Sequence, residues 1–183
     1  MNRRHATGRY GSAVIALHWL TVLLLVAVYA LIELRGIYPR GSDAHAAMKT
    51  WHFVLGLTVL ALLPLRLALR AADGAPPPIR PPLPVWQARL AGLVHLALYA
   101  FLLAMPVLGW FTLSALGKPV PFFGLELPAL IAADDTLGHS LEGIHETIGT
   151  LGYWLIGLHA AAALFHHGWM RDNTLRRMLP RRG

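Results

Sequence analysis

The segment HETIGTLGYWLIGLHAAAALFHH, residues 145–167, places four histidines in a run that otherwise consists largely of apolar and small residues. A run of about 20 mainly apolar residues is long enough to cross a bilayer as a helix. Ionisable side chains are costly at membrane depth, so those that occur there normally face the interior of a bundle and have a partner. The segment therefore predicts a membrane helix whose histidines face other helices.

The whole chain has the composition of a membrane protein, with 183 residues of which 56% are hydrophobic and only 14% are charged. We predict an all-α integral membrane protein that forms a four-transmembrane-helix bundle in one membrane domain, residues 1–183. The predicted helices cover about residues 12–34, 43–71, 86–115 and 138–170, and a short cytoplasmic tail covers 171–183.

The N-terminus also has the pattern of a cleaved secretory signal, because a basic start precedes an apolar run. That run continues to Leu34 and contains His18 and Trp19. The continuation favours a retained first helix.

Basic residues are distributed unevenly between the two sides of the predicted bundle. They gather in the N-terminus, the second connection and the tail: Arg3, Arg4, Arg9, Arg66, Arg70, Arg80, Arg89, Arg171, Arg176, Arg177, Arg181 and Arg182. The third connection has one lysine and four acidic residues. Because basic segments stay in the cytoplasm, both termini are predicted to be cytoplasmic. The net charge of +7 then indicates the lipid bilayer as a partner and gives no reason to expect nucleic acid.

Five histidines lie at predicted membrane depth, and they are His18, His52, His95, His145 and His159. The last two are 14 residues apart, so on a helix they share a face and are separated by about 21 Å. Zinc also binds imidazole, but two distant positions with few buried carboxylates suit it poorly. The chain has no cysteine, which excludes covalent haem attachment. We therefore predict two non-covalent b haems, each with histidine on both axial positions.

Depth in the membrane pairs some of these histidines but not all. His52 lies level with His145 in the outer half of the bilayer. In the inner half, either His18 or His95 matches His159, and depth does not choose between them. His166 and His167 lie at the inner boundary, where they serve either as interfacial anchors or as a contact for a quinone headgroup.

Four stretches, HWL (18–20), RGIYPR (35–40), the segment 145–167 and DNTLRRMLPRR (172–182), resemble the bacterial cytochrome b561 family. Within that family they are most similar to the superoxide oxidase group. The resemblance implies that His18 and His159 bind one haem iron while His52 and His145 bind the other. It also implies that His95 does not bind iron and either hydrogen-bonds a haem propionate or packs against the inner pair, and it places His166 near the quinone.

The resemblance implies a multi-pass oxidoreductase of the bacterial inner membrane that oxidises periplasmic superoxide to oxygen and reduces ubiquinone. Arg35, Arg40 and Lys49 would give its outer mouth a positive field that steers the superoxide anion. No obligatory protein partner is predicted.

Two alternatives remain at this stage. One is a quinol-oxidising electron conduit, or a membrane anchor, for a periplasmic redox partner. The other is a haem-free membrane transporter or scaffold.

Overall fold

Four long helices dominate the computed structural model, which describes residues 8–180. They are α1 (Ser12–Leu34), α2 (Asp43–Ala72), α3 (Val85–Ala115) and α4 (Asp135–Gly168). The shorter elements are the 3-10 helices η2 (Arg35–Ile37) and η3 (Arg176–Met178) and the strands β1 (Val120–Phe122) and β2 (Leu125–Leu127). Each long helix is long and apolar enough to cross a membrane. The predicted four-helix membrane bundle is confirmed.

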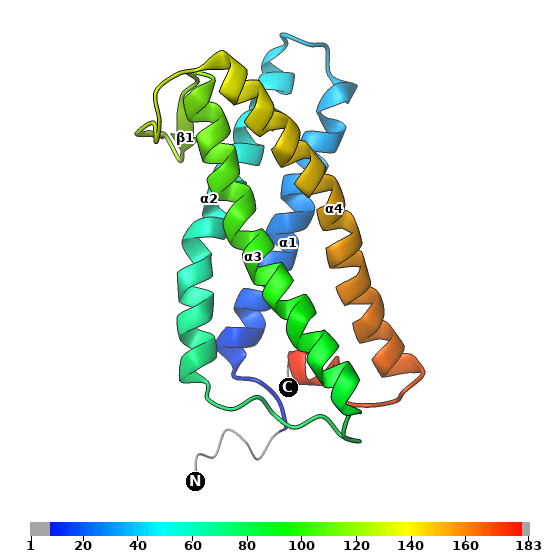
Figure 1. The fold of residues 1–183 in the computed structure, drawn as a ribbon. Coiled ribbons are helices and arrows are strands. Elements are labelled where there is room, and N and C mark those ends of the chain that lie inside the picture. The colour runs from blue at the N-terminus through cyan, green and yellow to red at the C-terminus, as the bar shows by residue number, and fades with distance from the viewer. Residues whose placement is uncertain (1–7, 181–183) are drawn as a thin grey trace.

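The helices form an up-and-down bundle in which α1 packs on α2, α2 on α3 and α3 on α4 (Figure 1). The Tyr29 hydroxyl of α1 donates to the Gly149 carbonyl of α4 at 2.7 Å and so closes the bundle. Residues 8–11, residues 171–180 and the connection 73–84 lie at one end, which we call the terminal end. The opposite end carries η2 and the two strands, and we call it the hairpin end.

Side-chain caps set the start of two helices. The Ser42 hydroxyl accepts a hydrogen bond from the His45 amide at 3.3 Å, and the Asp134 carboxylate accepts one from the Leu137 amide at 3.0 Å. Such caps satisfy amides that have no partner within the helix. Because Asp134 is the cap, α4 begins at Asp135, three residues before the predicted boundary, and it ends at Gly168 instead of residue 170.

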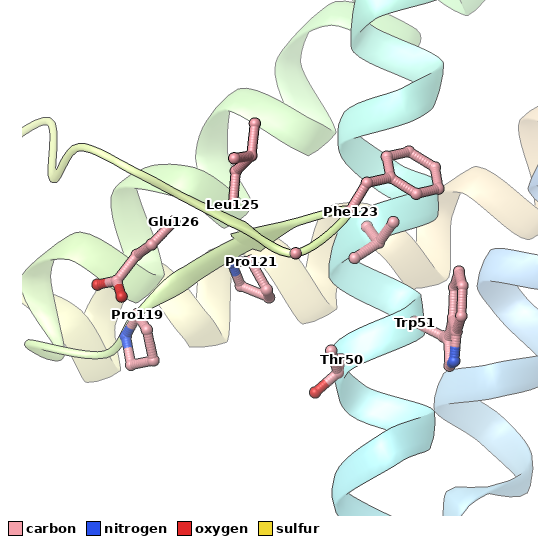
Figure 2. A pocket seen from close by; sticks show the side chains of 9 residues that line it. Thr50, Trp51, Pro119, Pro121, Phe123, Leu125 and Glu126 are labelled. Atoms are coloured by element: carbon pink, nitrogen blue, oxygen red, sulfur yellow. The ribbon is translucent and has the colours of Figure 1, made fainter.

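A two-stranded hairpin that the sequence did not indicate occupies the third connection. Phe123 and Gly124 form its turn and both have positive φ, 47° and 83°, as expected for a two-residue hairpin turn. The Leu130 amide donates to the Ser114 hydroxyl at 3.0 Å, which ties the chain beyond the hairpin to the end of α3. Figure 2 shows a pocket of about 430 Å³ between this hairpin and α2, with Trp51 at one side and no histidine in its wall.

The tail crosses the terminal end instead of projecting from it. The Tyr10 amide donates to the Arg177 carbonyl at 3.2 Å, and the Trp19 indole donates to the Met178 carbonyl at 2.7 Å. Asn173 accepts from the Arg80 amide at 2.9 Å, so the tail also holds the proline-rich connection 73–84. Of the basic residues used to predict orientation, Arg3, Arg4, Arg181 and Arg182 lie outside the described residues.

Candidate functional site

The first histidine pair lies toward the hairpin end, where His52 of α2 faces His145 of α4. Their ring centres are 6.3 Å apart. His52 Nδ1 lies 2.9 Å from the Val28 carbonyl oxygen, and since a carbonyl only accepts, this nitrogen carries the hydrogen. That tautomer leaves the other ring nitrogen, Nε2, with a free lone pair. His145 Nδ1 is buried without a hydrogen-bond partner.

The second pair lies toward the terminal end, where His18 of α1 faces His159 of α4 with ring centres 6.4 Å apart. His95 of α3 is also close to His159, at 5.4 Å between ring centres. The structure therefore brings both candidates for the inner site to the same histidine. Arg66 reaches His18 Nδ1 from α2 at 3.0 Å.

The ring spacings can be compared with those of a shared metal. A metal binds an imidazole nitrogen at about 2.0–2.1 Å and the ring centre lies about 1.1 Å beyond, so two opposed ligands have ring centres about 6.3 Å apart. The two pairs on α4 match this distance, whereas His95 and His159 are closer.

Conventional metal sites need more ligands than these pairs provide. Within residues 8–180, no three His, Cys, Asp or Glu side chains come together as a metal site. A pair of opposed histidines suits a metal whose other ligands come from a macrocycle, which is the chemistry of haem. The ring spacings of both pairs fit that group, and at the hairpin end His52 also presents a free Nε2 lone pair.

A narrow layer separates the two pairs. Gly152 lies seven residues from both His145 and His159 and is buried. A Cβ atom there would lie 2.3 Å from the Tyr29 hydroxyl oxygen and 2.5 Å from Phe101 Cζ. Only glycine therefore allows α1 and α3 to approach α4 this closely at mid-membrane.

A third group, His166 and Asp172, lies at the terminal end. His166 Nδ1 and Asp172 Oδ2 are 2.6 Å apart, and Asp172 is only 3% exposed. Burial acts to raise the pKa of Asp172, but hydrogen bonds from Thr174 and His166 outweigh it and hold that pKa below its ordinary value. This carboxylate stays ionised at neutral pH and orients the imidazole.

The three residues expected to steer superoxide all lie at the hairpin end. Arg40 is exposed, whereas Arg35 and Lys49 are half-buried. The Arg35 guanidinium donates to the Ile32 carbonyl, which holds it against the end of α1. The structure brings these cations to one end of the bundle but shows no contact among them.

Sequence reasoning misplaced one functional residue and overlooked the setting of another. It counted Arg66 among the cytoplasmic charges, but the structure places this side chain against His18 inside the bundle. The sequence did contain a sign of this position, because Arg66 interrupts an apolar run six residues before the end of α2. Sequence reasoning also did not place Asp172 in contact with His166, because nothing in a linear sequence shows that the tail folds back onto this histidine.

The chain is similar to known proteins over nearly its whole length. A family model for prokaryotic cytochrome b561 matches residues 9–181. Cytochrome b561 homolog 1 of Escherichia coli strain K12 is 40% identical over 176 residues, which covers 95% of this chain and 98% of that protein. Probable superoxide oxidase CybB of Yersinia pestis is 35% identical over 174 residues and covers 95% and 97% of the two chains. Cytochrome b561 homolog 2 of Escherichia coli strain K12 is 31% identical over 182 residues, with 93% and 91% covered.

These relatives do not indicate a haem-free transporter or scaffold. The chain belongs to the prokaryotic cytochrome b561 family of multi-pass inner-membrane proteins, which bind b-type haem and transfer electrons.

Proposed function

We propose that this cytochrome oxidises periplasmic superoxide and reduces ubiquinone by means of two b haems. The observation that carries the proposal is that the same histidine pair occurs twice along α4. At each end of its membrane span, an α4 histidine faces a histidine of another helix, and the two ring centres are 6.3 Å apart at one end and 6.4 Å at the other. When bound, b-type haem supplies one-electron redox chemistry. Two such sites on one membrane helix suit transfer between the two surfaces.

The ligand assignment follows the family resemblance and is supported by the ring geometry. We assign His52 and His145 to one haem and His18 and His159 to the other. His95 is less suitable than His18 because its ring centre is 5.4 Å from that of His159, which is too close for two opposed ligands on one metal. We assign His95 a packing role beside the inner site.

The charge distribution supports a periplasmic hairpin end. Exposed basic side chains at the terminal end include Arg80, Arg89, Arg171 and Arg176, whereas exposed acidic side chains at the hairpin end include Glu33, Asp43, Glu126, Asp134 and Asp135. Basic residues favour the cytoplasmic side. The His52 and His145 site then lies toward the periplasm.

The substrate assignment rests on the relative described as a probable superoxide oxidase and on the cations Arg35, Arg40 and Lys49. A local positive field raises the encounter rate with a small anion. Two superoxide anions each lose one electron and leave as oxygen. One ubiquinone takes up those two electrons and two protons and becomes ubiquinol.

The quinone headgroup is assigned to His166 at the terminal end. Because Asp172 Oδ2 accepts from Nδ1 of this ring at 2.6 Å, the opposite nitrogen has a free lone pair that can accept a hydrogen bond from a hydroxyl of the quinol product. Phe165 and Trp169 expose apolar surface on either side of His166 and His167, as a lipid-soluble substrate requires.

The test uses purified full-length protein, ubiquinone and an enzymatic source of superoxide, with and without superoxide dismutase. We expect about two haems per chain and quinone reduction that the dismutase suppresses. Quinone reduction that is indifferent to the dismutase would contradict superoxide as the electron donor. A protein without haem from haem-replete cells would contradict the redox assignment as a whole.

A further inference from the structure

The pocket of about 430 Å³ between the hairpin and α2 has one aromatic side and one acidic side. Trp51 and Phe123 lie at one side and the Glu126 carboxylate at the other (Figure 2). The ring centres of Trp51 and Phe123 are 6.5 Å apart in an edge-to-face arrangement, which joins α2 to the hairpin turn. These two side chains are 50% and 59% exposed, so the protein alone does not cover them.

The hairpin turn places an aromatic ring where its backbone favours a smaller residue. Phe123 has a φ of 47°, in the left-handed region that bulky side chains rarely adopt, and Gly124 completes the turn. Asparagine or aspartate is the usual residue at the first position of such a turn. Strained backbone of this kind is found mainly at ligand-binding and other functional sites. Here it holds the Phe123 ring at the wall of the pocket.

The α2 side of the pocket lies within the apolar layer of the membrane. Trp51 and Val54 flank His52, whose Nδ1 donates to the Val28 carbonyl of α1. Val28 is six residues before the end of α1 at Leu34, which is about 9 Å along the helix axis. With 23 residues, α1 is about 34 Å long, close to the thickness of the hydrocarbon core. The exposed aromatic side of the pocket is therefore at a depth that lipid occupies.

Glu126 is the only charged residue that lines the pocket. Neither ion pair of the described residues 8–180 involves it. A carboxylate beside a low-dielectric layer favours a cationic partner. Lys49 and Lys118 each directly precede a residue of the pocket wall, so positive charge is also available beside the pocket. Charges of both signs suit a zwitterionic headgroup.

We propose that this pocket binds a phospholipid with a protonated amine headgroup, of the phosphatidylethanolamine type. The ammonium group pairs with Glu126, and the first part of one acyl chain lies against Trp51 and Phe123. An anionic phospholipid has no partner for Glu126, and the same carboxylate repels the superoxide anion. This lipid site is separate from both histidine pairs and does not depend on the proposed substrates or on the number of haems.

The first test locates the lipid. Full-length protein in detergent micelles is irradiated with phosphatidylethanolamine that carries a diazirine in one acyl chain, and mass spectrometry of peptides identifies the crosslinked residues. We expect crosslinks within residues 50–54 and 119–126. Unlabelled phosphatidylethanolamine should compete about three- to fivefold better than phosphatidylglycerol with the same acyl chains, which is the effect of about one exposed ion pair.

The second test separates the charge from the space. Glu126→Gln should abolish the preference between the two headgroups, and Asp135→Asn, at an exposed carboxylate of the same end outside the pocket wall, should keep it. Thr50→Phe should fill part of the pocket and reduce crosslinking by either lipid. Ala47→Phe is its control, because it adds the same ring at an exposed position one turn earlier on α2, outside the pocket wall.

Three results would overturn the inference: crosslinks confined to other segments, equal competition by phosphatidylglycerol, or a headgroup preference that survives Glu126→Gln. Free ethanolamine at the same concentration should not compete, because it lacks the acyl chain. Competition by ethanolamine would show that the pocket takes a soluble ammonium compound, and the lipid would not be its ligand.

Discussion

Each end of the bundle presents a pair of facing histidines, and the two pairs have different surroundings. α4 contributes one histidine to each pair, and the ring spacings differ by only 0.1 Å, from 6.3 to 6.4 Å. At the hairpin end, a backbone carbonyl orients His52. At the terminal end, the charged side chain of Arg66 contacts His18. A single helix, α4, therefore repeats the same histidine geometry at both ends, while the neighbouring helices make the two ends chemically unequal.

The ends also differ in how they are closed. At the hairpin end, the third connection is held to α3 by the Asp134 amide on the Ala115 carbonyl at 2.8 Å and by two α3 side chains, Ser114 on the Leu130 amide and Trp110 on the Pro128 carbonyl. At the terminal end, side chains of the tail hold the proline-rich connection, and Asp172 is buried beside His166. A proton-coupled reaction needs titratable groups near the substrate, and the structure places the half-buried His166 and the buried Asp172 together at the terminal end.

The largest expected effect comes from removing one ligand at a time. His145→Ala should lower the haem content from two to one per chain, and His159→Ala should remove the other haem, because we propose that each pair binds its own iron. Haem extraction and reduced-minus-oxidised spectra measure the content, and the two variants should lose different spectral components. If either variant lost both haems while circular dichroism showed an intact helical fold, the two ends would not be independent sites.

A substitution at Gly152, which lies between the two histidine pairs, should disturb both sites together. Gly152→Leu should reduce the free energy of unfolding by about 1–3 kcal/mol, because the new side chain would overlap Tyr29 and Phe101. Thermal unfolding in detergent, followed by haem absorbance, measures the change, and both haem bands should weaken. Gly157→Leu is the control on the same helix, since nothing lies within 4 Å of a Cβ atom at that position. Equal losses in the two variants would show that the mid-membrane contact is unimportant.

At the terminal end, Asp172→Asn should destabilise the protein in a pH-dependent way. The folded-state pKa of Asp172 is lowered, so its carboxylate stabilises the fold above the ordinary value of 3.8 and loses this effect as the pH falls through the lowered value. The wild type should therefore exceed the variant by about 1–3 kcal/mol at pH 7, and the difference should shrink below about pH 4.

Thermal unfolding as a function of pH measures this difference, and Glu126→Gln, at an exposed carboxylate of the hairpin, is the control. A gap between wild type and Asp172→Asn that stayed constant down to pH 2 would contradict the linkage. The same variant should also slow quinone reduction, because His166 loses the group that orients it.

The smallest effect is expected for a single surface charge at the hairpin end. Arg40→Gln should lower the rate constant for the reaction with superoxide by about twofold and reduce its dependence on ionic strength, since exposed charges are screened by salt. Stopped-flow reduction at several salt concentrations measures both quantities. Arg89→Gln, which changes an exposed arginine of α3 at the terminal end, should leave them unchanged. A similar decrease in both variants would argue against local steering.

The sequence by itself determined the features that depend on one segment at a time. Apolar runs determined the four membrane helices, and the rise and rotation of an α-helix determined that His145 and His159 share a face. The family resemblance added the pairing of all four histidines, and both pairs lie together in the structure.

Only the tertiary structure decided which groups meet across helices. It placed Arg66 against His18, brought His95 and His18 to the same histidine, and folded Asp172 back onto His166. These contacts join residues that are between 6 and 141 positions apart, and they depend on how helices rotate and approach one another as they pack. Local periodicity carries no information about that rotation, so the inequality of the two ends becomes visible only in the folded bundle.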